Sequence, residues 1–185
     1  MRGQRSRGHT APVHVRRERP ADHDTVRAIH RAAFGRRETD RAVEVVEARL
    51  TDELRGDVGF LPHLSLVAVR DDVVVGHGLA TRGWLEPLGI PALGLGPLGV
   101  LPDAQGRGVG TALVHALLAV AEACEERVVA LLGAPAYYRR FDFRPGAELG
   151  IEAPDPAWGP HFQARHLTGP AVGGRFRYAS PFDAL

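Results

Sequence analysis

Gln105-Gly106-Arg107-Gly108-Val109-Gly110 follows a strand-like apolar segment and precedes the most regular helical pattern of the chain. The first turn of a helix has backbone N–H groups without intrahelical partners and carries a partial positive charge. Glycines leave these N–H groups unobstructed because they have no Cβ atom. The run therefore predicts a binding site for a phosphate or pyrophosphate group.

The helix after this run is predicted by apolar residues at i, i+3, i+4 and i+7. The pattern starts at Val109 and continues to Cys124, and Glu125 and Glu126 close the helix. Its members are Val109, Ala112, Leu113, Ala116, Leu117, Val120, Ala121 and Cys124. We therefore expect Cys124 to be a core residue. As the only cysteine it excludes an internal disulfide, which favours a reducing, cytoplasmic location.

The segment before the run, residues 93–100, is an unusual strand. Gly94, Gly96 and Gly99 weaken it, and Pro97 removes a ladder hydrogen bond. Such residues indicate a β-bulge or a place where a ligand approaches the backbone closely. We expect the bulge near residues 97–99, where it would separate this strand from the next one.

The remaining elements follow from periodicity and turn residues. Asp71 and Asp72 stand at the tip of a β-hairpin, where carboxylates are turn residues rather than a paired acid and base. The pattern predicts strands at 13–17, 64–69, 73–80, 127–132, 162–167 and 175–178. It predicts helices at 20–35 and 136–141, a further helix that begins near Thr39 or Asp40 and is followed by Gly56, and an extended piece at 142–145.

Composition limits the class of protein. The chain has 185 residues, 44% hydrophobic and 24% charged, with a net charge of +1. These values predict one globular domain and give no reason to expect nucleic acid as a partner. No stretch is long and apolar enough to span a bilayer. Residues 1–11 have no apolar segment of the kind a secretory signal needs, so we expect a disordered basic leader. A monomer and a homodimer both stay open.

Two common phosphate-binding motifs do not fit the glycine run. A Walker-type loop needs a Lys and a Ser or Thr after its second Gly, and the run has Gly110-Thr111 without that Lys. A dinucleotide fingerprint needs G-x-G-x-x-G in a repeated βαβ pattern. Here the glycines alternate, and a hairpin comes before the helix.

A third motif fits. Gln105, Gly108 and Gly110 match the string [Arg/Gln]-x-x-Gly-x-[Gly/Ala], which resembles the acetyl-coenzyme A (acetyl-CoA) loop of the GNAT acetyltransferases. Residues 136–143, Ala-Tyr-Tyr-Arg-Arg-Phe-Asp-Phe, resemble the segment that closes that domain. The order of elements from 13 to 143 is also similar to that of the family. The arrangement of Gly133, Tyr137, Tyr138 and Phe143, together with the C-terminal extension rich in Gly, Tyr and Phe, resembles a predicted bacterial subgroup of this family.

The resemblance implies an α/β fold with a mixed, largely antiparallel central sheet, a bulged strand at the cofactor, and helices on both faces. It implies an acetyltransferase domain at 12–150, with residues 151–185 as an extension packed on the same domain. The implied reaction moves an acetyl group from acetyl-CoA to a primary amine by direct attack in a ternary complex. The alternative is a non-catalytic module of the same fold that binds acyl-CoA as a sensor or scaffold.

By the same resemblance, the glycine run binds the pyrophosphate of CoA, and Arg107 adds charge there or at the 3′-phosphate. The pantetheine arm pairs with the backbone of Leu98 and Val100, and a backbone N–H near Gly99 and Val100 polarises the thioester. The full set of expected cofactor-binding residues is Leu98, Gly99, Val100, Gln105, Gly106, Arg107, Gly108, Val109, Gly110 and Thr111.

Tyr138 occupies the position of the family's tyrosine that protonates the leaving thiolate, and Tyr137 is the second choice. For the general base, His77 has a suitable intrinsic pKa and stands between two glycines of a strand. Glu86 and a water molecule are equal alternatives. The histidines show no metal-ligand spacing, so no metal is expected.

Two residues depart from the family pattern: Asp142 replaces the glycine usual before the final Phe, and Gly133 stands where many members have Asn. The acceptor cannot be read from the sequence. The segments expected to face it, at 34–39, at 84–87 and in the C-terminal tail, carry no decisive motif. A small amine, a peptide N-terminus, a protein lysine and an antibiotic all stay open as acceptors.

Overall fold

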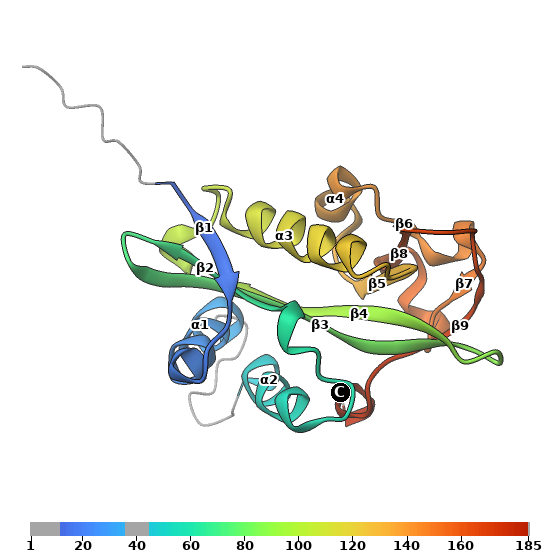
Figure 1. The fold of residues 1–185 in the computed structure, drawn as a ribbon, viewed down its shortest axis with the longest axis horizontal. Coiled ribbons are helices and arrows are strands. Elements are labelled where there is room, and N and C mark those ends of the chain that lie inside the picture. The colour runs from blue at the N-terminus through green and yellow to red at the C-terminus, as the bar shows by residue number, and fades with distance from the viewer. Residues whose placement is uncertain (1–11, 36–44, 185) are drawn as a thin grey trace, which may run out of the picture.

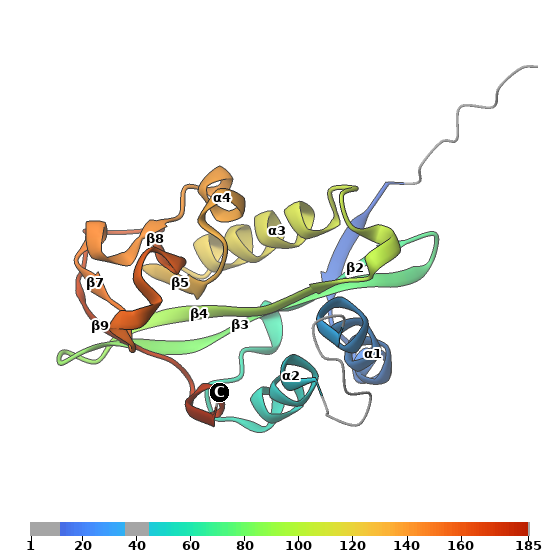
Figure 2. The same cartoon turned by 180° about the vertical axis from the view of Figure 1, so that it is seen from behind.

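A twisted sheet separates two layers of helices in the computed structural model, which describes residues 12–35 and 45–184. Figure 1 shows α3 (Val109–Ala123) and α4 (Pro135–Tyr138) on one face, and α1 (His23–Phe34) and α2 (Val46–Gly56) on the other. Figure 2 shows the same layers from behind. The expected leader at 1–11 and the expected start of the second helix near Thr39 or Asp40 lie outside the described residues.

The sheet has the order β1-β2-β3-β4-β5-β8-β6, and β9 pairs with β3 and β7. Only β4–β5 and β7–β9 are parallel among these pairs, so the expected mixed, largely antiparallel sheet is confirmed. The strands are β1 (His14–Arg17), β2 (Ser65–Arg70), β3 (Val73–Glu86), β4 (Ile90–Val100), β5 (Val128–Leu132), β6 (Arg144–Pro145), β7 (Ile151–Glu152), β8 (Phe162–His166) and β9 (Gly174–Arg177).

The hairpin between β2 and β3 turns through Asp71 and Asp72, which have φ values of 49° and 61°. Arg70 pairs with Val73, so the loop has two residues, and positive φ at both is what a tight hairpin turn requires. The role of these aspartates in the turn is confirmed. Within the described residues, no helix is both long and apolar enough to cross a bilayer.

The bulge lies in β4. Gly78 pairs with Leu98 and Ala80 with Leu95, so Gly96 and Pro97 together oppose the single residue Leu79. Beyond this point β4 no longer pairs with β5, because the two strands are matched only from Leu93 to Gly94. The predicted separation of the two strands is therefore present.

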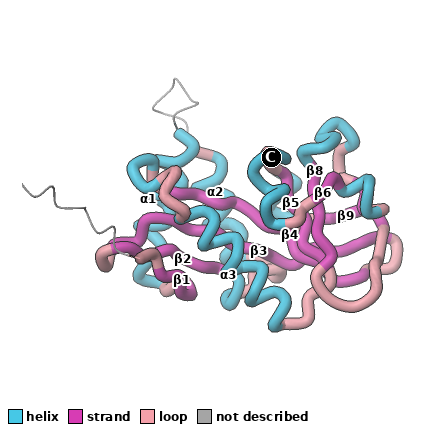
Figure 3. The backbone as a smooth tube through the Cα atoms, turned by 90° about the horizontal axis from the view of Figure 1, so that it is seen from above, coloured by secondary structure: helices cyan, strands magenta, loops and turns pink. Residues whose placement is uncertain are grey.

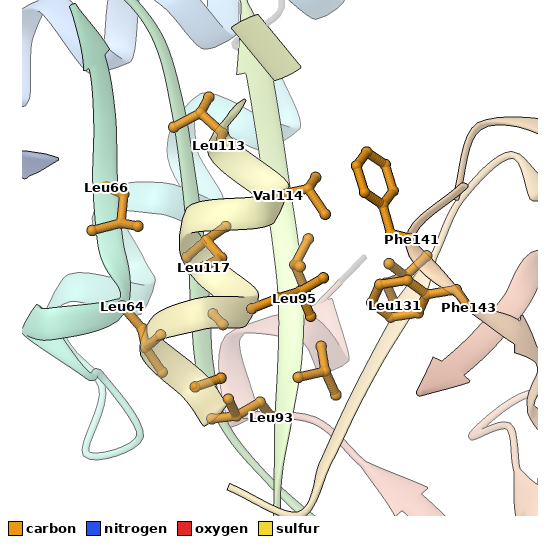
Figure 4. Packing of buried hydrophobic residues seen from close by; sticks show 14 of the residues in the cluster. Leu64, Leu66, Leu93, Leu95, Leu113, Val114, Leu117, Leu131, Phe141 and Phe143 are labelled. Atoms are coloured by element: carbon orange, nitrogen blue, oxygen red, sulfur yellow. The ribbon is translucent and has the colours of Figure 1, made fainter. Parts of the chain in front are cut away.

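The larger core cluster lies between α3 and the sheet. Figure 3 shows α3 lying over the strands, and Figure 4 shows its leucines packed on β2, β4 and β5. The central members are Leu66, Leu93, Leu95, Leu113, Leu117, Leu131, Phe141 and Phe143. The expectation that Cys124 belongs to this core is wrong. The helix ends at Ala123, and Cys124, at the C-cap, is exposed.

The segment after residue 150 adds strands to the same sheet. β8 pairs with β5 over Val128–Leu132, and β9 pairs with the end of β3 from Trp84 to Glu86. A second cluster of buried apolar residues, which includes Phe162, Phe176 and Tyr178, lies beneath these strands. The extension therefore enlarges the same sheet, beside β5 and beside the end of β3.

Candidate functional site

A cavity of about 570 Å³ lies at the carboxyl end of β4, where α1, the start of α3, and α4 come together. This volume is within the range of small-molecule sites. The cavity is lined by Ala33, Phe34, Leu98, Val100, Gln105, Gly106, Gly108, Val109, Gly110, Thr111, Tyr137, Tyr138 and Arg140. It therefore gathers nearly all of the expected cofactor-binding residues. Gly99 and Arg107 are the two that do not line it.

The glycine run forms an open cradle at the start of α3. Gly106 and Gly108 have φ values of 70° and 81°, a conformation that favours glycine, and a Cβ at either would meet no atom within 4 Å. The first intrahelical hydrogen bond runs from Ala112 N to Gly108 O (2.9 Å). The N–H groups of the preceding turn, from Val109 to Thr111, thus have no intrahelical partner and suit an anion.

Two side chains tie this loop to the sheet. Gln105 Nε2 donates to Val100 O (3.0 Å), and Arg70 Nη2 donates to Arg107 O (3.3 Å). Arg107 is exposed. Hydrogen bonds thus hold the loop at Gln105 and at Arg107, while the described residues leave the space next to Gly106 and Gly108 open.

The strand register decides which backbone groups of β4 face the cavity. Leu101 N donates to Val75 O (2.9 Å), and Gly99 stands opposite His77. Along an antiparallel pair, the residues that bond across the ladder alternate with those that do not. The backbone groups of Leu98 and Val100 therefore point away from β3, toward the gap left by β5, whereas those of Gly99 point into the ladder.

Two tyrosines complete the α3 side of the cavity. Tyr137 is hydrogen-bonded to Thr111, and a Cβ on Gly110 would lie 2.6 Å from the Tyr137 hydroxyl. The Tyr138 ring packs edge-on against Phe143, with centroids 5.8 Å apart. Burial, and then the neighbouring Tyr137, raise the pKa of Tyr138 well above its ordinary value, so the phenol keeps its proton at neutral pH.

The same region explains both departures from the family pattern. A Cβ on Gly133 would lie 2.4 Å from Tyr138 Cε2, so a residue with a side chain would displace this ring. Asp142 has a φ of 63°, a conformation that glycine adopts freely and that aspartate tolerates better than most residues. The two changes therefore fit this chain's own backbone.

Sequence reasoning missed Arg140 as a cavity residue. Its Nε donates to Tyr137 O (2.9 Å), and its guanidinium carbon lies 4.7 Å from the centre of the Tyr137 ring. Its position could have been inferred from the sequence, because Arg140 is three residues after Tyr137 and residues three apart on a helical turn share a face. Arg140 brings a positive charge to a cavity that otherwise offers backbone donors.

The two candidate bases lie away from the cavity wall. Glu86 is at the far end of β3, where its carboxylate pairs with Arg177 (3.0 Å). His77 is fully buried on the α1 face of the sheet. Its Nδ1 lies 2.8 Å from His30 Nε2, and its Nε2 lies 3.0 Å from Ser65 Oγ.

The buried hydrogen-bonded cluster around His77 also includes Glu18, Ser65 and Arg55, which sequence reasoning did not select. Ser65 Oγ and Arg55 both donate to the carboxylate of Glu18. Burial acts to raise the pKa of Glu18, but the neighbouring His77 and the hydrogen bonds from Arg55 and Ser65 outweigh it and hold this pKa well below its usual range. His30 shares the buried face of α1 with Val26 and Ile29. A histidine on this apolar face was the one feature of the sequence that could have identified His30 as a candidate site residue.

In the described part of the chain, no three His, Cys, Asp or Glu side chains are arranged to hold a metal ion. The polar side chains that line the cavity are instead those of Gln105, Thr111, Tyr137, Tyr138 and Arg140.

Comparison with known proteins places this geometry in a family. The sequence profile of the acetyltransferase (GNAT) family matches residues 23–143. The uncharacterized N-acetyltransferase YjhQ of Escherichia coli K12 is 33% identical over 139 residues, which is 74% of this chain and 72% of the relative. The uncharacterized N-acetyltransferase YhbS of the same strain is 31% identical over 161 residues, or 86% of this chain and 90% of the relative.

Two solved structures have the same architecture. E. coli YhbS in complex with CoA superimposes with a TM-score of 0.82 and 27% identity, over 94% of this chain and 93% of that one. A Brucella melitensis GNAT acetyltransferase in complex with acetyl-CoA gives a TM-score of 0.74 and 31% identity, over 94% and 99% of the two chains. From the family profile and these relatives together, we conclude that this chain belongs to the GNAT acetyltransferase family.

Proposed function

We propose that this protein transfers an acetyl group from acetyl-CoA to a primary amine, by direct attack of the amine in a ternary complex. One observation carries the proposal: the open glycine cradle at the start of α3 shares a single cavity with two tyrosines and the free edge of β4. Similar GNAT proteins have been crystallised with CoA and acetyl-CoA, which supports the same co-substrate here.

The chain's own groups fit that ligand. The N–H groups of the first turn of α3 suit the pyrophosphate, and the cradle admits it because Gly106 and Gly108 have no Cβ. The backbone groups of Leu98 and the N–H of Val100 face the gap beside β4, where an added pantetheine strand would pair with them, whereas Val100 O already accepts from Gln105. Acetyl-CoA supplies the thioester, and a Val100 N–H in that gap would polarise its carbonyl.

Tyr138 acts as the proton donor to the departing thiolate. Its side chain lines the cavity and its phenol is protonated at neutral pH, so the hydroxyl can donate to the thiolate as it forms. Tyr137 is the second choice, because its hydroxyl already interacts with Thr111. The acceptor is a small amine, a peptide, a protein lysine or an antibiotic. Cytoplasmic location and a monomeric or homodimeric state complete the proposal.

The competing function is a non-catalytic acyl-CoA sensor or scaffold. Such a module would be favoured if the C-terminal extension closed the acceptor side of the cavity. None of the described residues from 151 to 184 lines the cavity. This open arrangement favours the enzyme.

An amine panel tests the proposal. Acetyl-CoA is offered with tyramine, a peptide with a free N-terminus, a lysine-containing peptide with a blocked N-terminus, or kanamycin, and CoA release is followed with a thiol reagent. The protein carries Cys124→Ser because the exposed Cys124 would itself react. We expect release that depends on one amine class, with the acetylated product seen by mass spectrometry. A thermal shift with acetyl-CoA but no amine-dependent release would favour the sensor.

A further inference from the structure

Four polar side chains form a continuous buried chain on the α1 face of the sheet. Ser65 Oγ donates to Glu18 Oε2, and His77 Nε2 lies 3.0 Å from Ser65 Oγ and 3.7 Å from Glu18 Oε2. His77 Nδ1 lies 2.8 Å from His30 Nε2. Both imidazoles are fully buried. These residues come from four separate segments, so the chain exists only in the folded protein.

The direction of each hydrogen bond follows from the carboxylate. Glu18 is ionised and only accepts, so the Ser65 hydroxyl proton points at it and the Ser65 oxygen accepts from His77 Nε2–H. A neutral His77 with its proton on Nε2 has a lone pair on Nδ1, which accepts from His30 Nε2–H. His30 therefore presents a lone pair at Nδ1.

That lone pair has no partner. Among the described residues, no group is placed to hydrogen-bond His30 Nδ1, although the atom is buried. A Cβ on Gly99 would lie 2.8 Å from it, so the atom faces β4 at the residue between Leu98 and Val100. Those two residues line the cavity, and so do Ala33 and Phe34, one turn beyond His30 on α1. The unpartnered nitrogen thus lies behind the wall where α1 meets β4.

We infer that His30 Nδ1 accepts the proton of the attacking amine through one water molecule, and that Glu18, Ser65 and His77 hold His30 in the required tautomer. This inference rests on the proposed function. The N–H bond of the amine breaks as its nitrogen bonds to the acetyl carbon, and the proton goes to Nδ1. The resulting imidazolium donates through Nε2 toward His77 and the Glu18 charge. Tyr138 gives its proton to the leaving thiolate and later regains one from solvent, and His30 releases the amine proton to solvent, so the protons balance.

Both histidines are neutral at pH 7. Burial, and then the neighbouring His77 and Arg55, lower the pKa of His30 to about 3, so its Nδ1 carries no added proton at neutral pH. Burial also lowers the pKa of His77, against the opposing effect of Glu18.

The first test needs no acceptor. In ¹⁵N-labelled protein with acetyl-CoA at pH 7, long-range ¹H–¹⁵N NMR spectra report which ring nitrogen of each histidine carries the proton. We expect Nε2–H on both His30 and His77, and a changed tautomer balance of His77 in Glu18→Gln. A proton on Nδ1 of His30 would overturn the inference.

The second test uses the panel amine that the wild type acetylates fastest. His30→Gln keeps a donor for His77 but has no basic nitrogen, and we expect kcat to fall about 10²-fold with an unchanged acetyl-CoA thermal shift. His115→Gln, an exposed histidine of α3, is the matched control. A kcat for His30→Gln within about threefold of wild type would contradict the proton-acceptor role.

Chemical rescue separates chemistry from packing. Imidazole should restore turnover to His30→Ala, whereas pyrazole, which has the same size and is a far weaker base, should not. Equal rescue by both would show that His30 only fills space. If the proposed function itself is wrong, the wild type will instead show no thermal shift with acetyl-CoA, whatever the histidine tautomers.

Discussion

The two faces of β4 provide different kinds of functional group. On the α3 face, an open cavity is lined by backbone groups, glycines and two tyrosines. On the α1 face, Glu18, His30, Ser65 and His77 form a buried chain of side chains. The cavity is lined mostly by one contiguous run and one short helix, with two residues each from β4 and α1, whereas the buried chain comes from four distant segments. In the proposed function, cofactor binding would depend on local backbone shape, whereas proton transfer would depend on tertiary assembly.

Tyr138→Phe tests the α3 face with the largest expected effect. The variant keeps the ring that packs on Phe143 and removes only the hydroxyl. We expect kcat to fall about 10²-fold while the acetyl-CoA thermal shift stays the same. Steady-state kinetics and thermal scans check both points. An unchanged kcat would remove Tyr138 from the reaction and transfer the acid role to Tyr137, which Tyr137→Phe would then reveal.

Acid unfolding tests the α1 face. The ordinary histidine pKa is 6.5 and that of folded His30 is about 3, so between these values the unfolded chain binds a proton that the folded protein does not. The free energy of unfolding must therefore fall as pH falls, and His30 alone contributes a loss of about 2 kcal/mol by pH 5. Urea titrations at pH 7 and pH 5 measure it.

In His30→Gln this share of the loss should disappear, whereas His115→Gln should retain it. The neighbouring charges that face the pair are Glu18, Arg55 and His23. Glu18 titrates mostly below its ordinary value of 4.5, so it contributes little above pH 5. An equal pH dependence in wild type and His30→Gln would show that His30 is not held neutral by burial.

Gly133→Ala tests how tightly the tyrosine is held, with the smallest expected effect. The new Cβ would lie 2.4 Å from Tyr138 Cε2, so the ring must move. We expect a loss of about 1 kcal/mol and a Tm lower by about 2–4 °C. Gly56→Ala is the matched control because a Cβ there meets nothing within 4 Å. Equal Tm values for the two variants would mean that Tyr138 has room to shift freely.

The α3 face could be predicted largely from sequence because its information is local. The glycines, the residues of the bulge and the tyrosine segment each occupy one short run, and the resemblance to the GNAT family implied the type of sheet. The error at Cys124 has a physical cause. The apolar periodicity continues by one position past the end of the helix at Ala123, and periodicity alone cannot show where a helix ends.

The α1 face could not be predicted in this way. Glu18 and Ser65 lie 47 positions apart, and so do His30 and His77, so no motif connects them. Only strand register places His77 beside Gly99 and beneath α1. His77 was selected as a base for its type and position, but its buried link to His30 required the folded structure. Gly133 and Asp142 similarly became interpretable only once their backbone surroundings were known.

The central claim is that the glycine cradle at the start of α3 binds acetyl-CoA. Gly108→Glu tests it, with Gly89→Glu as control. Both glycines have positive φ, 81° and 61°, and open space beyond the Cβ position, but Gly89 lies at the β3–β4 hairpin, far from the cavity. Thermal scans with and without millimolar acetyl-CoA give the measurement. We predict a clear shift for wild type and Gly89→Glu and none for Gly108→Glu. A full shift in Gly108→Glu, or none in the wild type, would contradict the account.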